Sequence, residues 1–138
     1  MREILFRGKR VDNGKWVYGN LIDNECCKKP IIVEVDYLNE YGDCGEVSYE
    51  VDETTVGQFT GLTDKNGKKI FEGDILKIHR KSIYSTEEYF FYKVDWGKDW
   101  NGWALISIKS AQSRYLDNAY NGEVIGNIHD NPELLEGV

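Results

Sequence analysis

The sequence contains few of the residues on which disulfides, metal sites and histidine-dependent catalysis rely: three cysteines, two histidines and two prolines in 138 residues. It also lacks long apolar runs. Ile31–Val33 and Ala104–Ile106 are among the longest, whereas a membrane-spanning helix needs about 20 apolar residues. Charges interrupt every apolar stretch of residues 1–10, which argues against a secretory signal. We therefore expect a protein of the cytoplasm with no membrane partner.

The cysteines do not predict a disulfide framework or a metal site. Cys26 and Cys27 are adjacent and Cys44 stands apart, and adjacent cysteines rarely form a disulfide with each other. The two histidines, His79 and His129, do not lie at a zinc-finger spacing from the cysteines, and no C-x-x-C motif occurs. We expect structural or incidental thiols, no metal and no cofactor, with a metal site as the less favoured alternative.

No group of residues predicts catalysis. The chain has no G-x-S-x-G, H-E-x-x-H or phosphate-loop pattern. Glu87 and Glu88 are neighbours and would point to opposite faces of a strand, so they make a poor acid and base pair. We expect a protein that is not an enzyme. The alternative, an enzyme with dispersed carboxylates, would require a deep polar pocket with perturbed acids.

The charge of the chain argues against a surface that binds phosphates throughout. The formal net charge is −7, whereas duplex binding draws most of its affinity from lysine and arginine. One basic segment remains as a candidate nucleic-acid contact: Lys77, His79, Arg80 and Lys81. The plainer interpretation of this segment, which we favour, is a solvated strand end.

Turn chemistry is the dominant structural signal. Four Asn-Gly dipeptides occur, at 13–14, 66–67, 101–102 and 121–122. Asn-Gly favours the type I′ turn of a two-residue β-hairpin, because both central residues of that turn need positive φ. Four such turns, most of them beside β-branched or aromatic residues, predict a mostly β protein.

Strand-like patterns flank these turns, at 4–11, 15–22, 31–35, 46–51, 54–60, 75–79, 89–96, 103–109 and 124–128. The clearest alternation is Tyr89–Trp96, where Phe90, Tyr92, Val94 and Trp96 share one face. Helix is predicted to be minor. Residues 110–119 have poor helical periodicity, and the carboxyl end suits one short helical turn.

In that terminal turn, Asn131 is a good N-cap and Pro132 suits the first helical position. Many short strands joined by tight turns favour a barrel or sandwich. We predict an amino-terminal β region over residues 1–60, packed on a small β-barrel with the terminal helical turn over residues 61–138. One continuous domain is the alternative.

The most unusual segment is the hairpin that contains three of the four tryptophans. Trp96 and Trp103 suit core positions at strand ends, whereas Trp100 lies beside the turn and is harder to bury. Trp100 could pack against the amino-terminal region, contact another chain, or stack on single-stranded bases, although nearby aspartates would repel a nucleic-acid backbone. The candidate partner contact comprises Asp99, Trp100 and Asn101.

Three blocks carry a family likeness: residues 1–8, residues 56–75, and residues 124–128 followed by 131–135. In this order the sequence resembles the YopX family, whose members are typically encoded by bacteriophages and prophages. The resemblance implies a barrel similar to the SH3-type roll. It supplies no catalytic residue, because the molecular role of the family is uncharacterised.

The longest block also has a plain physical interpretation. Its glycines, together with Asp64 and Asn66, suit turns, and Phe59, Leu62 and Ile70 suit a core. We therefore predict that the block specifies the fold. The function that we expect is a non-enzymatic accessory protein of a phage or prophage. It would act through contacts with an unidentified host or phage protein and as a homo-oligomer. The alternative is a small-barrel nucleic-acid-binding or regulatory protein.

Overall fold

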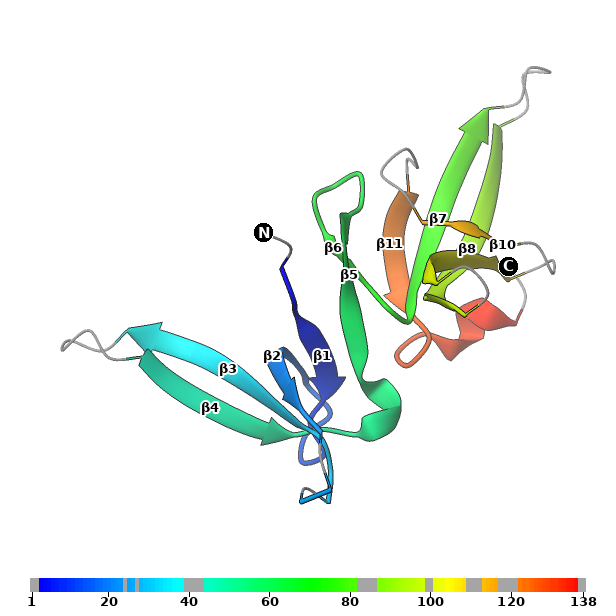
Figure 1. Ribbon diagram of the computed structural model, residues 1–138. Helices are drawn as coiled ribbons and strands as arrows, with labels where there is room; N and C mark the ends of the chain where they lie inside the picture. Colours follow the sequence, from blue (N-terminus) through cyan, green and yellow to red (C-terminus); the bar gives the residue numbers. More distant parts are fainter. Residues whose placement is uncertain are drawn as a thin grey trace. The chain divides into compact units, whose positions relative to one another are not determined.

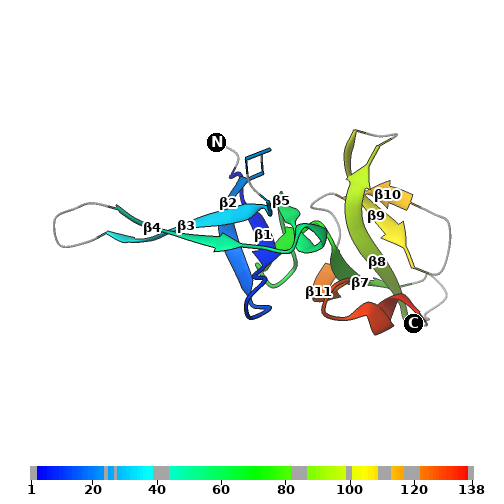
Figure 2. The same cartoon turned by 90° about the horizontal axis from the view of Figure 1, so that it is seen from below.

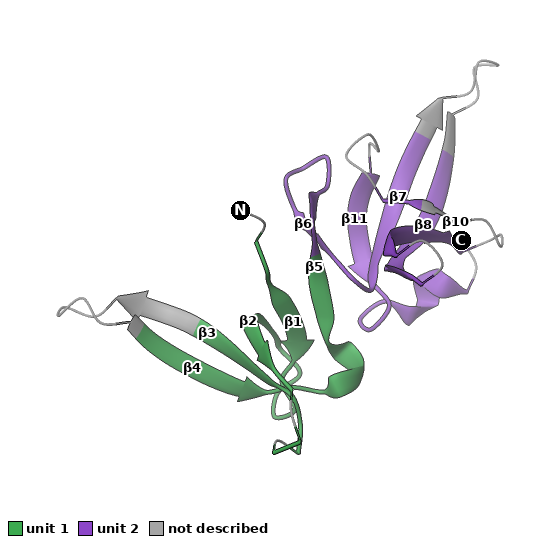
Figure 3. Cartoon of the chain, viewed as in Figure 1, with its two compact units in different colours: residues 1–59 green, residues 60–138 purple. Residues whose placement is uncertain are grey.

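A computed structural model describes residues 3–23, 25–26, 28–38, 44–81, 87–98, 101–108, 113–116 and 122–136, without the side chains at 35–38, 44, 80–81, 87–88 and 113–114. The chain forms two compact units, Met1–Phe59 and Thr60–Val138 (Figure 3). Each unit has its own hydrophobic cluster, and each is described by itself below.

The first unit is an antiparallel sheet with the strand order β4-β3-β2-β1-β5 (Figure 1). Its strands are β1 (Phe6–Lys9), β2 (Trp16–Ile22), β3 (Ile31–Leu38), β4 (Cys44–Glu50) and the first part of β5 (Gly57–Thr63). Viewed from below, β3 and β4 run together as a two-stranded ribbon (Figure 2).

One face of this sheet forms a small core. Val17, Ile32 and Val51 are buried, and Phe6, Leu21, Tyr49 and Val56 pack around them. Ile32 lies opposite Leu21 in the register, so alternation along β2 and β3 brings their side chains to the same face.

The start of the predicted strand 54–60 is instead a 3-10 turn, η1 (Glu53–Thr55). Asp52 causes this difference, because its carboxylate accepts hydrogen bonds from the Thr54 backbone at 3.0 Å and the Thr54 hydroxyl at 2.8 Å. The Thr55 hydroxyl donates to the Asp52 carbonyl and accepts from the Lys9 backbone, which fixes the turn beside β1.

The second unit contains the remaining elements. Five of its strands form an antiparallel sheet in the order β10-β9-β8-β7-β11. They are β6 (Lys69–Phe71), β7 (Asp74–Lys81), β8 (Glu87–Gly97), β9 (Gly102–Ser107), β10 (Ser113–Tyr115), β11 (Gly122–Asn127) and the 3-10 turn η2 (Pro132–Leu135). All pairings in this five-stranded sheet are antiparallel, and β6 extends the other sheet beyond β5.

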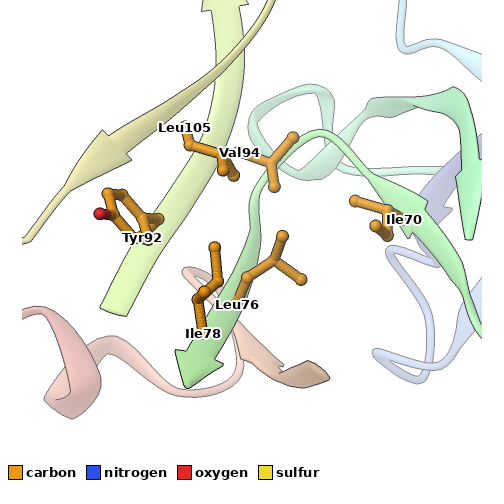
Figure 4. Packing of buried hydrophobic residues seen from close by; sticks show 6 residues of the cluster. All are labelled: Ile70, Leu76, Ile78, Tyr92, Val94 and Leu105. Carbon is orange, nitrogen blue, oxygen red and sulfur yellow. The ribbon is translucent and has the colours of Figure 1, made fainter. Parts of the chain in front are cut away.

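The core of the second unit draws side chains from four strands. Its buried residues are Ile70, Leu76, Ile78, Tyr92, Val94 and Leu105 (Figure 4). Each such side chain, fully buried, stabilises the fold by roughly 1.5–3 kcal/mol before the entropy of ordering is subtracted. The alternation predicted for residues 89–96 is confirmed at Tyr92 and Val94, which are 6% and 1% exposed.

The prediction of a mostly β protein is confirmed, and the strands form two open antiparallel sheets and not a closed barrel. Side chains, rather than a further strand, satisfy backbone donors of β11 at its edge: the Val124 N–H donates to the Asp64 carboxylate at 3.0 Å. Residues 110–119, whose helical periodicity is poor, contain a strand where they are described, since Ser113–Tyr115 pairs with β9.

The predicted turn type is wrong at the hairpins. A type I′ turn needs positive φ at both central residues, but among the described non-glycine residues Asn101 alone has positive φ, at 52°. At residues 64–67, the Gly67 N–H donates to the Asp64 carbonyl at 3.0 Å and Gly67 has φ of 82°. This is the pattern of a type I turn with aspartate first and glycine fourth. Asn121 lies outside the described residues.

The expected cap of the terminal turn is also different. The Asn131 side chain makes no capping hydrogen bond into η2, and its oxygen instead accepts from the Asn127 backbone at 3.2 Å. The Asn127 side-chain oxygen accepts in turn from the backbones of His129 and Asp130, at 3.0 and 2.9 Å. Two asparagines therefore close the chain end onto β11.

This closure makes Gly126 a sensitive position. A Cβ there would collide with the Asn131 side-chain oxygen and lie 2.8 Å from its Cγ. We expect Gly126→Ala to lower the free energy of unfolding by about 2 kcal/mol, since the asparagine must move and its bonds break. Urea unfolding followed by tryptophan fluorescence measures the change.

The matched control is Gly122→Ala in the same strand, where the nearest atom is Ile78 Cγ1 at 3.4 Å. That variant should unfold within about 1 kcal/mol of the unmodified chain. Equal losses in both variants would show that the Asn131 contact is not what requires glycine.

Candidate functional site

The side of the five-stranded sheet that faces away from the core cluster carries the candidate site, and we call it the outer face. In the register of β7 and β8, Leu76 lies opposite Tyr92 and Ile78 opposite Phe90, and these point to the core. The residues between them therefore point outward: Lys77 opposite Phe91, and His79 opposite Tyr89.

Three of these outer-face side chains form a stack. The Lys77 ammonium lies 4.2 Å from the centre of the Tyr89 ring, and the His79 ring centre lies 4.9 Å from it at an interplanar angle of 35°. Tyr89 nevertheless remains 50% exposed. A half-exposed aromatic ring in contact with a cation and an imidazole presents an ordered contact surface.

In the sheet register, glutamates lie opposite the basic residues of the predicted basic segment. A glutamate lies across from each lysine or arginine in it: Lys77 with Glu123, Arg80 with Glu88, and Lys81 with Glu87. The predicted nucleic-acid contact at Lys77, His79, Arg80 and Lys81 stays a prediction. Its formal charge, however, is largely cancelled by its own sheet, which weakens attraction to phosphates.

The outer face continues past β11 onto a turn. The Lys65 backbone N–H donates to the Gly122 carbonyl at 3.0 Å, which places this turn alongside β11. The Lys65 ammonium lies 3.8 Å from the Glu123 carboxylate, and both side chains remain about two-fifths exposed. Across the sheet, the order is therefore Lys65, Glu123, Lys77 and the aromatic residues of β8.

The tryptophan hairpin is only partly described. Asp99 and Trp100, two of the three predicted partner-contact residues, lie outside the described residues; Asn101 is exposed in the turn. Trp103 packs on the core as expected, but the core assignment of Trp96 is wrong, since Trp96 is 42% exposed. Trp96 contacts Trp103 edge to face, with ring centres 5.1 Å apart, where the core ends.

The first unit contains a hollow of about 220 Å³. Its lining includes Arg10, Asp12 and Tyr49. The Arg10 guanidinium donates to both Asp12 carboxylate oxygens, at 2.9 and 2.6 Å, and stacks on the Tyr49 ring. The hydrogen bond from Arg10 also lowers the pKa of Asp12 below its usual 3.8. Local partners therefore already occupy Arg10 and Asp12 in this hollow.

Within the described part of the chain, no three histidine, cysteine, aspartate or glutamate side chains gather where they could hold a metal ion. Among the same residues, no helix has the length and apolar character to span a bilayer. Of the cysteines, Cys26 is exposed.

Asp64 is the most heavily bonded carboxylate that the described contacts show, and it is 8% exposed. One of its oxygens accepts the backbone N–H groups of Asn66 and Lys68, both at 2.9 Å, and the other accepts that of Val124 at 3.0 Å. Burial opposes its ionisation, but the three N–H donors outweigh burial and hold the pKa of Asp64 below its usual 3.8.

The other two sequence blocks also have structural roles. In the first, Arg7 is 6% exposed and its guanidinium carbon lies 4.6 Å from the centre of the Trp16 ring. In the third, Gly126 and Asn131 form the closure described above. The prediction that residues 56–75 specify the fold therefore extends to all three blocks.

Comparison with known proteins identifies the family. The model of the YopX protein family matches residues 5–136, nearly the whole chain. The chain therefore belongs to the YopX family. No curated protein gave a significant match.

A solved structure shares the fold. The crystal structure of protein EF1440 from Enterococcus faecalis aligns with a TM-score of 0.58 over 99% of this chain and 100% of that chain. The two sequences are 23% identical, so the likeness concerns the fold alone.

Sequence reasoning missed the outer-face row. The alternation of residues 89–96 had already put Tyr89 and Phe91 on the second face of that strand. Lys65 and Glu123, however, lie 58 positions apart, and only the pairing of β11 with β7 and the Asp64 bond to Val124 bring them together.

The lowered pKa of Asp64 gives a prediction about acid stability. A carboxyl whose pKa is lower in the folded than in the unfolded chain stabilises the fold fully above the unfolded pKa. That contribution disappears as the pH falls through the folded pKa, here below 3.8. We expect Asp64→Asn to lower the free energy of unfolding by about 2 kcal/mol at neutral pH. Its urea midpoint should also fall less steeply below about pH 4 than that of the unmodified chain.

Urea midpoints measured between neutral and acid pH check this. The control is Asp12→Asn, which removes an exposed carboxylate whose pKa is also lowered and should leave the neutral midpoint unchanged. If Asp64→Asn kept the full acid dependence and the full neutral stability, the three-donor interpretation of Asp64 would be wrong.

Proposed function

We propose that this protein is an accessory protein of a bacteriophage or prophage that acts by protein–protein contact, without catalysis, as a homo-oligomer in the bacterial cytoplasm. Membership of the YopX family supports the phage setting, since such proteins are typically encoded by phages and prophages. The contact is made with a further copy of the chain and with a host or phage protein.

The outer face is the observation that carries this proposal. Tyr89 is half exposed there, with Phe91 beside it in the sheet, and Lys77 has Glu123 across the register. Protein interfaces favour aromatic residues in a setting of low net charge, and Tyr is among the residues that most often dominate binding energy. The overall charge of −7 makes this balanced face distinct from the chain as a whole.

The oligomer clause has a direct test. We expect light scattering on the purified chain at micromolar concentration to give a mass that is a multiple of the chain mass and falls on dilution. Such an interface desolvates aromatic rings, so high salt should not abolish it. A strictly monomeric mass at all concentrations would contradict the homo-oligomer.

The second candidate is a nucleic-acid-binding or regulatory protein, and one observation favours it. The Lys77, Tyr89 and His79 stack combines an exposed ring with a cation, as in sites where single-stranded bases stack. For this candidate, anisotropy of a labelled single-stranded oligonucleotide should rise at low salt, fall steeply with added salt, and lose the rise in Tyr89→Ala. An unchanged anisotropy at low salt would exclude it.

A further inference from the structure

The row across the outer face is complementary to itself. Its order is Lys65, Glu123, Lys77 and then Tyr89 with Phe91, on four adjacent elements: the 64–68 turn, β11, β7 and β8. Adjacent strands lie roughly 4.8 Å apart, so the row is spaced regularly. Read in reverse, it presents an aromatic group to a cation, a cation to an anion, an anion to a cation, and a cation to an aromatic group.

In the described contacts, the two central charges, Lys77 and Glu123, do not form an ion pair with each other. Lys77 and Glu123 are Cα partners in the register, yet the Lys77 ammonium lies over the Tyr89 ring on one side. The Glu123 carboxylate lies 3.8 Å from the Lys65 ammonium on the other. This distance and the exposure of both groups make the pair weak. Both central charges can therefore gain from an opposite charge placed above them.

We propose that a second copy of the chain docks face to face on this row, about a two-fold axis parallel to β7 and above the line between β7 and β11. This proposal rests on the homo-oligomer of the proposed function and adds the surface that forms it. The axis reverses the row of the second copy. Lys77 of each copy then lies over Glu123 of the other, and Tyr89 of each lies over Lys65 of the other.

Such an interface is isologous, because the same patch is used twice and every contact occurs in duplicate. Packed sheet faces lie roughly 10 Å apart, a distance that a lysine and a glutamate extended toward each other can span. Because the patch covers only part of one sheet face, we expect it to bury less area than the roughly 800 Å² per partner of a standard interface. The dissociation constant should therefore be on the order of micromolar.

A second copy fits this row better than a nucleic acid does. A phosphate backbone would meet Glu123 in the middle of the row, where its carboxylate would repel the phosphates. A second copy instead supplies one cation for each anion of the row. The complementary charges then fix the register of the two copies and disfavour other arrangements.

Charge reversal tests the pairing. K77E places two glutamates against each other at the interface, and E123K places two lysines there. We expect each variant alone to dimerise at least about tenfold more weakly than the unmodified chain, because two attractive contacts become repulsive. In an equimolar mixture of K77E with E123K, every contact again joins opposite charges, so a mixed dimer should form. Sedimentation velocity of the full-length chain, with one variant labelled by a fluorophore, measures both effects.

The matched controls are K15E and E25K, which reverse exposed charges in the first unit and should leave the dimer unchanged. A dimeric unmodified chain whose association neither K77E nor E123K weakens would overturn this interface while leaving the homo-oligomer intact. Weakening in each variant without rescue in the mixture would overturn the reciprocal pairing. A monomeric unmodified chain would overturn both, and oligonucleotide binding by that monomer would favour the second candidate function.

Discussion

The second unit depends on one buried carboxylate. Asp64 accepts two N–H groups of its own turn and a third from β11, 60 positions away, so it shapes the β5–β6 turn and attaches it to the edge of the five-stranded sheet. A buried charge is costly unless several donors satisfy it, and here the donors outweigh burial. The same bonds set Lys65 beside Glu123 and thereby complete the row on the outer face. A single residue of the longest family block thus connects the fold to the proposed interface.

The family-like blocks and the proposed site carry different kinds of information. Arg7 and Asp64 are buried, Gly126 packs against the Asn131 side chain, and their roles lie in closing turns and edges. Tyr89, Lys77 and Glu123 lie outside those blocks and are exposed or half-buried, whereas Lys65 is supplied by the longest block. A scaffold held by a few specific buried contacts can carry different side chains on its outer face. One fold can therefore serve several functions.

Local patterns predicted the strands well and the tertiary contacts poorly. Alternation located β8 and the core side chains Tyr92 and Val94, because burial on one face of a sheet has a period of two. Asn-Gly located the turns but not their type, since the Asp64 side chain selects a type I turn that the dipeptide alone does not indicate. Asp52 likewise turned the start of a predicted strand into a 3-10 turn. Trp96 was assigned to the core because alternation continues to the end of β8, whereas the core stops before it. The outer-face row needed the register of β11 on β7, which no local pattern specifies.

The central claim is that family blocks hold the scaffold while the outer face of the second unit makes the contact. Amide hydrogen exchange of the full chain, followed residue by residue as protein concentration increases, tests it most directly. The account predicts added protection around Lys65, Lys77, Tyr89 and Glu123, with no change in the first unit. Added protection confined to the Asn101 turn or to the β3–β4 ribbon, or no change at any concentration, would contradict it.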